Sequence, residues 1–380
     1  MNVITNLKVN LILKITIFFW LVTKIISFKL WTSDRLFPVI PTFNFLENCP
    51  NWFHLTLYLF GICTLVFVFF YPNKKNIIGL TILLEITSCL LDQNRWQPYQ
   101  YHFILIFCFA FFLRDNKNFI NYFIFLLFVI YVNSGLHKLN GGFLYYIWEN
   151  LMLKQFFGLE NYQINNIIIH YLGLFIGLFE FFCGLGLLFS KFKKIAAVLL
   201  IAMHFFIIIL LSPIGIAHNY VVLPWNCAMI LFLWVIYFSN INNTFNFWVL
   251  VKGYHIIFFV LIGLMPIFNF FGLYDNYLSF KLYSGNLQKM YICVHNDKDA
   301  SRYKSYFLKD RKEINCQNII SISYWSLKEM NVLVNPEKRV FIKIAQKWKE
   351  INPNIEATFY LVDYPYQSKN FVQISESGNN

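Results

Sequence analysis

Long apolar stretches recur along most of this chain and are separated by short polar breaks. A helix needs about 20 apolar residues to cross a bilayer, so the pattern predicts a polytopic membrane bundle. Several stretches are shorter than this, which indicates tilted or partly re-entrant helices. By contrast, the stretch at 164–190 is long enough to be steeply tilted or broken near Gly173. We expect nine spans, at about residues 9–28, 54–71, 76–91, 99–113, 119–138, 164–190, 194–212, 222–238 and 250–271.

The scarcity of charge excludes a soluble protein. Charged residues make up 13% of the chain and hydrophobic residues 58%, whereas a soluble domain carries roughly 25% charged residues. The net charge of +12 does not indicate a nucleic-acid partner, because such a partner requires basic residues gathered in a patch or stripe. The composition therefore predicts an integral membrane protein whose main partner is the lipid bilayer, with no nucleic-acid partner.

The charges divide the chain into two expected domains. Residues 274–380 hold 15 basic and 11 acidic residues, whereas residues 1–273 are sparsely charged for their length. We therefore expect an all-α transmembrane domain over 1–273 and a small soluble α/β domain over 274–380.

Within the soluble domain, local patterns predict both strands and a helix. Asn335 followed by Pro336 is typical of an N-cap and first helical position. The helix that follows is amphipathic and should end before Pro353, and residues 367–380 are expected to fray. Strands are predicted at 290–294, 319–324 and 357–363. The apolar stripe of the helix is Val340, Phe341, Ile344, Ala345 and Trp348.

Basic residues in the short loops predict the orientation, because cytoplasmic loops carry more Lys and Arg. With a cytoplasmic N-terminus, eight such residues fall inside and four outside. Nine spans then place the tail outside a plasma membrane or bacterial inner membrane, whereas an even number of spans would reverse the tail. The inner set is Lys8, Lys74, Lys75, Arg114, Lys117, Lys191, Lys193 and Lys194; the outer set is Lys29, Arg35, Arg95 and Lys154.

Two further features follow from this topology. The first apolar run resembles a signal peptide, but the bulky residues Phe28-Lys29-Leu30-Trp31 follow it instead of a small-residue cleavage site, so it is expected to be the first span. Cys293 and Cys316 fall on the predicted outer side, where they are candidates for a disulfide. No Cys or His spacing in the sequence indicates a metal site.

Polar residues at membrane depth are the most informative about function, because each must be paired or must line a wet cavity. Glu85, Lys138, Glu180 and His204 lie within or at the ends of expected spans. A lone buried histidine is more often a structural hydrogen-bond partner than a catalyst, so His204 alone does not indicate an active site.

Lys138 allows two interpretations. A lysine at the end of a span can extend its ammonium to the interface. However, Asn133, Ser134 and Gly135 precede it, where a lipid-facing helix would be apolar. Ser134 and Lys138 are four residues apart and share a helix face. An inward-facing Lys138 is therefore at least as well supported, and a desolvated lysine can act as a base.

The polar turn between the third and fourth expected spans also allows two interpretations. It contains Asp92, Arg95, Trp96 and Tyr99. The simpler interpretation is a tight hairpin with interfacial aromatic residues and an Asp92–Arg95 pair. The functional interpretation is a polar lid or floor over a buried site.

Three polar turns converge on the outer side in the predicted topology. They are the turn at 92–98, the turn at 139–143 with Asn140, and the turn at 213–221 with His218 and Asn219. Lys138, His204 and Asn226 lie on the same side of the bundle. One outward-facing polar cavity would account for all of them.

These segments resemble a known family. Gly135-Leu-His-Lys-Leu-Asn-Gly141 is similar to the Gly-x-x-Lys-Leu-Asp stretch of vitamin K-dependent gamma-carboxylases and the wider horizontally transferred transmembrane family. Leu91-Asp-x-x-x-Trp96-x-x-x-x-Tyr101 resembles the carboxylase segment Leu-Asp-x-x-x-Trp-Asn-Asn-His-x-Tyr. The span with Met203-His204 and its following Ser-x-x-Gly turn is similar to a later histidine-containing helix of the family. The resemblance covers roughly residues 10–285.

The resemblance implies a reduced naphthoquinone, vitamin K or menaquinol, as cofactor. Lys138 would correspond to the lysine that deprotonates it, and His204 to a histidine of the same site. The chain departs from the pattern, with Gln97-Pro98-Tyr99 where the carboxylases have Asn-Asn-His, and Asn140 where they have Asp. The implied function is a quinol-dependent membrane enzyme. Because of the departures, glutamate carboxylation is not assigned as its reaction. The alternative is a non-catalytic assembly subunit that docks a protein partner through its exterior tail; a solute transporter is third.

Overall fold

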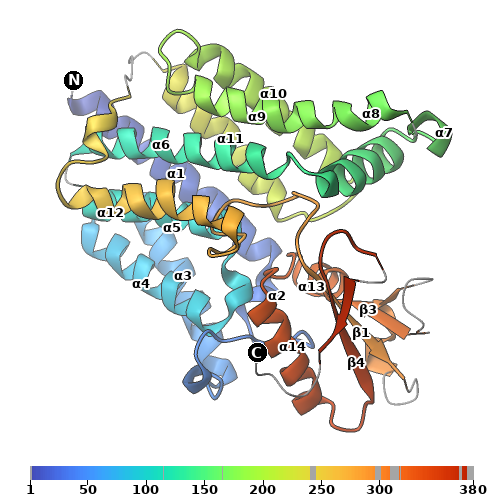
Figure 1. The fold of residues 1–380 in the computed structure, drawn as a ribbon. Coiled ribbons are helices and arrows are strands. Elements are labelled where there is room, and N and C mark those ends of the chain that lie inside the picture. Colours follow the sequence, from blue (N-terminus) through green and yellow to red (C-terminus); the bar gives the residue numbers. More distant parts are fainter. Residues whose placement is uncertain are drawn as a thin grey trace.

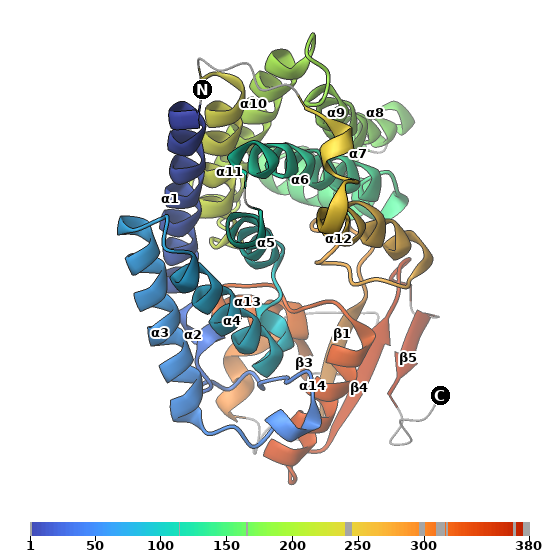
Figure 2. The same cartoon turned by 90° about the vertical axis from the view of Figure 1, so that its left-hand side faces the viewer.

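A helical bundle and a small sheet make up the computed structural model of the chain, in which residues 2–113, 115–164, 166–239, 245–295, 301–308, 316, 318–367 and 370–374 are described. The sheet and its two helices lie at one end of the bundle (Figure 1). The N-terminus lies at the opposite end, as the second view also shows (Figure 2).

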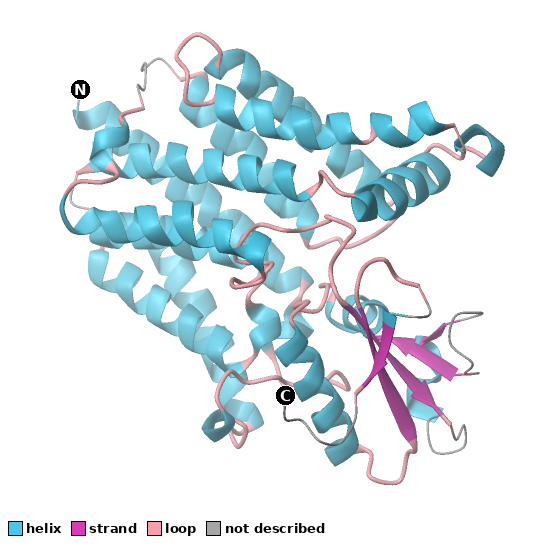
Figure 3. Cartoon of the chain, viewed as in Figure 1, coloured by secondary structure: helices cyan, strands magenta, loops and turns pink. Residues whose placement is uncertain are grey.

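The bundle is built from helices that run between its two ends (Figure 3). Its α-helices are α1 (Asn2–Ile26), α2 (Phe28–Trp31), α3 (Asn51–Phe70), α4 (Lys75–Leu91), α5 (Pro98–Phe112), α6 (Asn116–His137), α7 (Asn161–Ile164), α8 (Ile167–Leu172), α9 (Leu174–Gly186), α10 (Lys193–Leu211), α11 (Val222–Tyr237) and α12 (Ile256–Phe259). Its other helices are η1 (Asn44–Leu46), η2 (Gln93–Arg95), the π-helix η3 (Phe143–Phe156), η4 (Phe247–Val249), η5 (Gly253–His255), η6 (Val260–Leu264) and η7 (Met265–Phe271).

The expected count of nine spans is not supported. Within the described parts of the chain, six helical stretches are long and apolar enough to cross a membrane: Thr5–Ile26, Asn51–Phe70, Asn116–His137, Ile167–Gly186, Lys193–Leu211 and Gly253–Phe271. The other three expected spans correspond to the shorter helices α4, α5 and α11. Most of α5 is buried by its neighbours, so this helix lies inside the bundle although it is shorter than the roughly 20 residues that cross a bilayer.

The close crossing of α6 and α9 depends on two glycines. A Cβ added to Gly135 would lie 2.6 Å from the backbone nitrogen of Phe181 and 2.7 Å from the carbonyl oxygen of Gly177. A Cβ added to Gly177 would lie 2.8 Å from the carbonyl oxygen of Gly135. Small residues of this kind let the backbones of membrane helices approach closely. This contact places the C-terminal end of α6 beside α9.

Replacing Gly135 with alanine is expected to lower the free energy of unfolding by about 1–3 kcal/mol, because the new methyl group overlaps backbone that cannot turn aside. Thermal unfolding in mild detergent would measure the loss. Gly79→Ala is the matched control, because the Cβ there meets the ring of the half-buried Phe111, a side chain that can rotate. Equal stability of the two variants would contradict the proposed backbone contact.

The sheet has five antiparallel strands in the order β2-β3-β1-β4-β5. The strands are β1 (Lys289–Val294), β2 (Phe307–Leu308), β3 (Asn318–Ser321), β4 (Ala357–Val362) and β5 (Phe371–Gln373), with the short helix η8 (Ser301–Tyr306) between β1 and β2. Helices α13 (Ile322–Met330) and α14 (Lys338–Ile351) complete the tail. The predicted apolar stripe of α14 is confirmed, since all five of its side chains are buried.

The structure corrects three predictions for the tail. The expected strand 319–324 ends at Ser321, whose hydroxyl accepts a hydrogen bond from Tyr324 N and begins α13. Helix α14 begins at Lys338 with Glu337 as its N-cap, so the expected cap at Asn335 is wrong by two positions. The segment expected to fray contains β5, which pairs with β4; residues 375–380 lie outside the described chain.

Candidate functional site

A cavity of about 570 Å³ lies inside the bundle. Its walls come from α6, η3, α9, α10 and α11, and from residues 280–283 after the last helix of the bundle. The lining is mostly aliphatic and aromatic, with two charged side chains, Lys138 and Glu180. The volume falls within the roughly 300–1,000 Å³ typical of small-molecule sites.

The Lys138 side chain points into the cavity and does not extend toward the membrane–water interface. Its Nζ pairs with Glu180 of α9 and donates to Ser134 Oγ at 2.5 Å. The side chains of Lys138 and Glu180 are 14% and 7% exposed. The α6–α9 crossing at Gly135 and Gly177 brings these two side chains together. Glu180 was identified from the sequence as a polar residue at depth, but nothing local in the sequence names it as the partner of Lys138.

A second polar chain in the cavity wall runs through His204. Tyr131 Oη lies 2.7 Å from His204 Nε2, and His204 Nδ1 lies 2.7 Å from Asn226 Oδ1. Asn226 is itself oriented by its Nδ2, which donates to Val222 O at 2.8 Å. Because an amide oxygen only accepts hydrogen bonds, Nδ1 donates to Asn226. Both ring nitrogens of His204 are therefore engaged, one by Asn226 and the other by the Tyr131 hydroxyl.

The Lys138–Glu180 pair and the polar chain through His204 both include residues of α6, which forms one wall of the mostly apolar cavity. Tyr131, Ser134 and Lys138 follow each other at helical spacing on α6, so the Cα atoms at the ends of this row are about 10 Å apart along the helix. Of the lining residues, the exposed ones are Phe175 of α9 and Leu199 and Ala202 of α10, all apolar. The exposed part of the lining is therefore apolar, and the lining as a whole suits an apolar molecule with a polar head.

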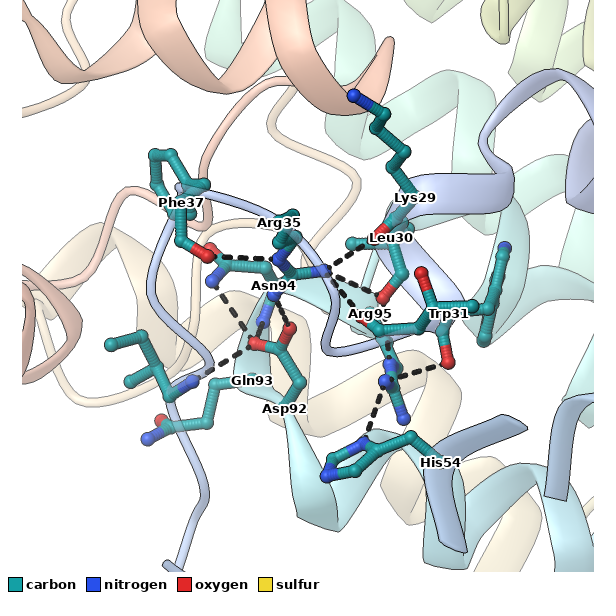
Figure 4. A network of polar contacts seen from close by, with 12 residues as sticks. Lys29, Leu30, Trp31, Arg35, Phe37, His54, Asp92, Gln93, Asn94 and Arg95 are labelled. Carbon is teal, nitrogen blue, oxygen red and sulfur yellow. Dashed lines mark hydrogen bonds and ion pairs between the residues drawn. The ribbon is translucent and has the colours of Figure 1, made fainter. Parts of the chain in front are cut away.

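Asp92 and Arg95 do not line this cavity. The expected Asp92–Arg95 pair is wrong, because Asp92 pairs with Arg35 instead (Figure 4). Asp92 Oδ1 also accepts from Asn94 N at 3.1 Å and from Asn94 Nδ2 at 3.0 Å. These bonds satisfy the carboxylate within the turn between α4 and α5.

Arg95 is fully buried and binds backbone and neutral side chains. Its guanidinium donates to Leu30 O, Ser88 O and Trp31 O at 2.9–3.0 Å, and to Ser88 Oγ at 2.9 Å. Its Nη2 lies 3.0 Å from His54 Nδ1 (Figure 4). One side chain thus joins α2, α3 and α4, which is a structural role.

Four other predicted residues lie outside the cavity lining. Tyr99 is fully buried at the start of α5, and the ring of Trp96 lies 6.5 Å from that of Tyr101. Asn133 Nδ2 donates to Val129 O at 3.1 Å within its own helix. His218 is partly buried in the loop between α10 and α11, where burial lowers its pKa.

Asn140 and Asn219 hold the segment that follows the last helix of the bundle. Asn140 Nδ2 donates to Ser284 O at 3.1 Å, and Asn219 Nδ2 donates to Tyr283 Oη at 2.9 Å. Tyr283 in turn lines the cavity, whereas the two asparagines do not. The sequence showed no pattern that would identify Tyr283 as a lining residue.

The turn at 92–98 is a platform for the C-terminal domain. Gln97 Nε2 donates to Leu333 O at 2.9 Å, and Asn335 Nδ2 donates to Gln93 O at 3.1 Å. Glu329 accepts from Leu36 N at 2.6 Å. All three polar turns thus contact residues beyond 273, so their convergence on one side reflects the docking of this domain as much as the cavity.

A second buried cluster of charges contains Glu85, which the sequence identifies as a polar residue at membrane depth, and Lys24, which it does not. Lys24 of α1 pairs with Glu85 of α4 at 2.8 Å, and their side chains are 1% and 2% exposed. Gln100 Nε2 donates to the same carboxylate at 2.9 Å and its Oε1 accepts from Trp20 Nε1 at 2.6 Å. The Lys24 ammonium also lies 3.3 Å from the ring centroid of Trp31. Lys24 sits within a long apolar run, and no local pattern revealed its partner.

No group of three or more His, Cys, Asp or Glu side chains that could hold a metal ion occurs in the described residues. Cys293 and Cys316 form a disulfide. No protein-family profile, curated protein or solved structure matches this chain.

Proposed function

We propose that this chain is an integral membrane protein that binds a reduced naphthoquinone-type lipid in the cavity beside Lys138. The observation that carries the proposal is a buried Lys138–Glu180 pair at the wall of a mostly apolar cavity whose exposed lining residues are apolar. The ring system and the hydrocarbon chain of the ligand would fill the apolar part of the cavity, and a ligand hydroxyl would reach the Lys138–Glu180 pair. The resemblance to the carboxylase family in the segments around Lys138 and His204 supports the same ligand class.

The pair supports a specific proton transfer. Lys138 Nζ already donates to Ser134 and Glu180, so the group in the pair that is able to accept a hydroquinone proton is the Glu180 carboxylate. With a hydroquinone hydroxyl held at the pair, Glu180 would accept the proton of its O–H group, and the Lys138 ammonium would stabilise the negative charge left on that oxygen. His204 would orient a second oxygen of the ligand through Tyr131.

The proposed orientation places the tail outside the cytoplasm. It rests on the Cys293–Cys316 disulfide, because disulfides persist in oxidising compartments. The eight-to-four count of basic residues assumes nine spans, and with a cytoplasmic N-terminus the six spans of the described chain would place the tail on the inner side instead. The proposed setting is a plasma membrane or a bacterial inner membrane.

Lys138→Ala is expected to weaken binding of reduced menaquinone roughly 10- to 100-fold, because a charge-assisted hydrogen bond to the ligand is lost. Binding would be measured on the purified protein in nanodiscs under anaerobic conditions. Met203→Trp, which fills the cavity, should abolish binding without touching the charged pair, whereas Lys194→Ala, at an exposed lysine of α10, should leave it unchanged. A wild-type protein that binds reduced menaquinone no better than Lys138→Ala and Met203→Trp would refute the proposal.

A further inference from the structure

The chain between the last bundle helix and the sheet forms part of the cavity wall. Phe280, Leu282 and Tyr283 line the cavity together with Lys138 and Glu180. These residues follow η7, which ends at Phe271, and precede β1, which begins at Lys289. We call residues 280–285 the strap. In Figure 2 the chain between α12 and β1 lies on the side of the bundle that carries the sheet, opposite the N-terminus.

The backbone of the strap is strained at two aromatic residues. Phe280 has a φ of 57° and Tyr283 a φ of 55°. For a bulky residue the left-handed region is a genuine outlier, and such conformations persist where surrounding contacts impose them. Both strained residues line the cavity. Gly285, with a φ of 74°, closes the strap where a Cβ would lie 2.2 Å from Gly142 O.

Hydrogen bonds from both the bundle and the tail hold the strap. On the bundle side these are the bonds from Asn219 to Tyr283 Oη and from Asn140 to Ser284 O. On the tail side, Tyr366 Oη donates to Gly285 O at 3.1 Å and lies 2.5 Å from Leu287 O. These anchors are neutral hydrogen bonds, each of which contributes modestly to stability.

The strap is also coupled to another wall of the cavity. The Lys289 ammonium lies 3.6 Å from the ring centroid of Tyr366 and 4.5 Å from that of Tyr146 in η3. The rings of Tyr146 and Tyr366 are 4.9 Å apart. Helix η3 supplies Phe143 and Ile147 to the cavity. The tail thus contacts both the strap and η3, so a displacement of the tail would open the same end of the cavity.

We propose that the strap closes the aqueous end of the cavity and that its release admits water-borne molecules to Lys138 and Glu180. This inference rests on the proposed function only in treating the cavity as the binding site. A lipid would enter through the apolar edge formed by Phe175 and Leu199. A polar, water-soluble co-substrate would enter past the strap, so the tail controls which of the two classes of molecule reaches the charged pair.

Cysteine labelling in the full-length protein tests the strap without any quinone. Ser134→Cys places a thiol inside the cavity, in a background where the six unpaired cysteines are replaced by alanine. The probe is a membrane-impermeant, positively charged methanethiosulfonate, applied to the protein in nanodiscs. With the native strap, labelling is expected to be slow compared with a cysteine at an exposed loop position.

Removing both bundle-side anchors with Asn140→Ala and Asn219→Ala should accelerate labelling roughly ten- to thirtyfold, as expected from the loss of two neutral hydrogen bonds. Tyr366→Phe, which removes the tail-side anchor, should accelerate it in the same direction. Tyr277→Phe is the matched control: Tyr277 Oη donates to Val334 O at 3.0 Å, outside the strap, and its loss should not change the rate. Gel filtration of every variant checks that it is folded.

Labelling that is already fast with the native strap overturns the proposal. So does labelling that stays slow in the anchor variants, or that accelerates equally in Tyr277→Phe. If labelling accelerates when the anchors are removed but reduced menaquinone does not bind, the proposed closure by the strap is supported and the proposed ligand is wrong. If reduced menaquinone binds but the labelling rate does not change in the anchor variants, the proposed closure by the strap is wrong and the proposed function is supported.

Discussion

Replacing Arg95 with methionine is expected to lower the free energy of unfolding by about 3–5 kcal/mol, because the substitution leaves several buried acceptors without a donor. The acceptors are the carbonyl oxygens of Leu30, Trp31 and Ser88. Arg95 is fully buried, so water does not replace the lost donors. Thermal unfolding in mild detergent and the yield of monodisperse protein would measure the effect.

Arg339→Met is the matched control. The Arg339 side chain is 51% exposed and binds Asp275 and Gln93, so its loss should cost less than about 1 kcal/mol. Arg95→Lys should remain clearly destabilised, because one ammonium cannot reach the acceptors that the planar guanidinium binds together. An Arg95→Met protein as stable as Arg339→Met would show that the network in Figure 4 does not hold the helices together.

The second large effect concerns the Lys24–Glu85 pair. Glu85→Leu should lower the free energy of unfolding by about 3–5 kcal/mol, since it leaves an ammonium in the core without its counter-ion. Lys24→Met should have a similar effect, because it leaves the carboxylate unpaired. The double variant is expected to recover most of the loss, because replacing a buried pair with apolar residues of similar volume is often neutral.

The double-mutant cycle gives the result as a coupling free energy. Unfolding midpoints of the four proteins would be measured in the same detergent at the same pH. Gln100, which donates to Glu85, stays in place in all four and keeps the comparison matched. If the two single losses simply add in the double variant, the two charges do not interact and the pair in the structure is wrong.

The apolar pattern was enough to predict a helical membrane bundle followed by a polar tail. It works because hydrocarbon cannot satisfy an exposed backbone, so long apolar runs with few charges must be helical. The amphipathic stripe from Val340 to Trp348 was equally readable, since its spacing is local. The number of spans was not predicted, because the apolar runs of α4, α5 and α11 resemble spans in composition but form helices too short to be counted among the six.

The candidate site was predictable in part. Lys138, His204 and Asn226 stood out as polar residues in apolar surroundings, and the structure brings all three to one cavity. Their partners, Glu180 and Tyr131, depend on how closely α6 and α9 cross and on which helix faces α10. Asp92 and Arg95 were equally conspicuous in the sequence, yet they hold the turn and helices α2, α3 and α4 together and lie outside the cavity.

Local sequence was therefore sufficient to predict which segments are apolar and which are polar, and to predict the periodicity of the helices. Both properties depend on residues within a few turns. The pairing of buried charges depended on the packed fold. Asp92 selects Arg35 over a neighbour three residues away, and Lys24 finds Glu85 some sixty residues later. A buried charge needs an opposite charge or hydrogen-bond partners at short range, and which groups lie at short range is set by the packing of distant segments.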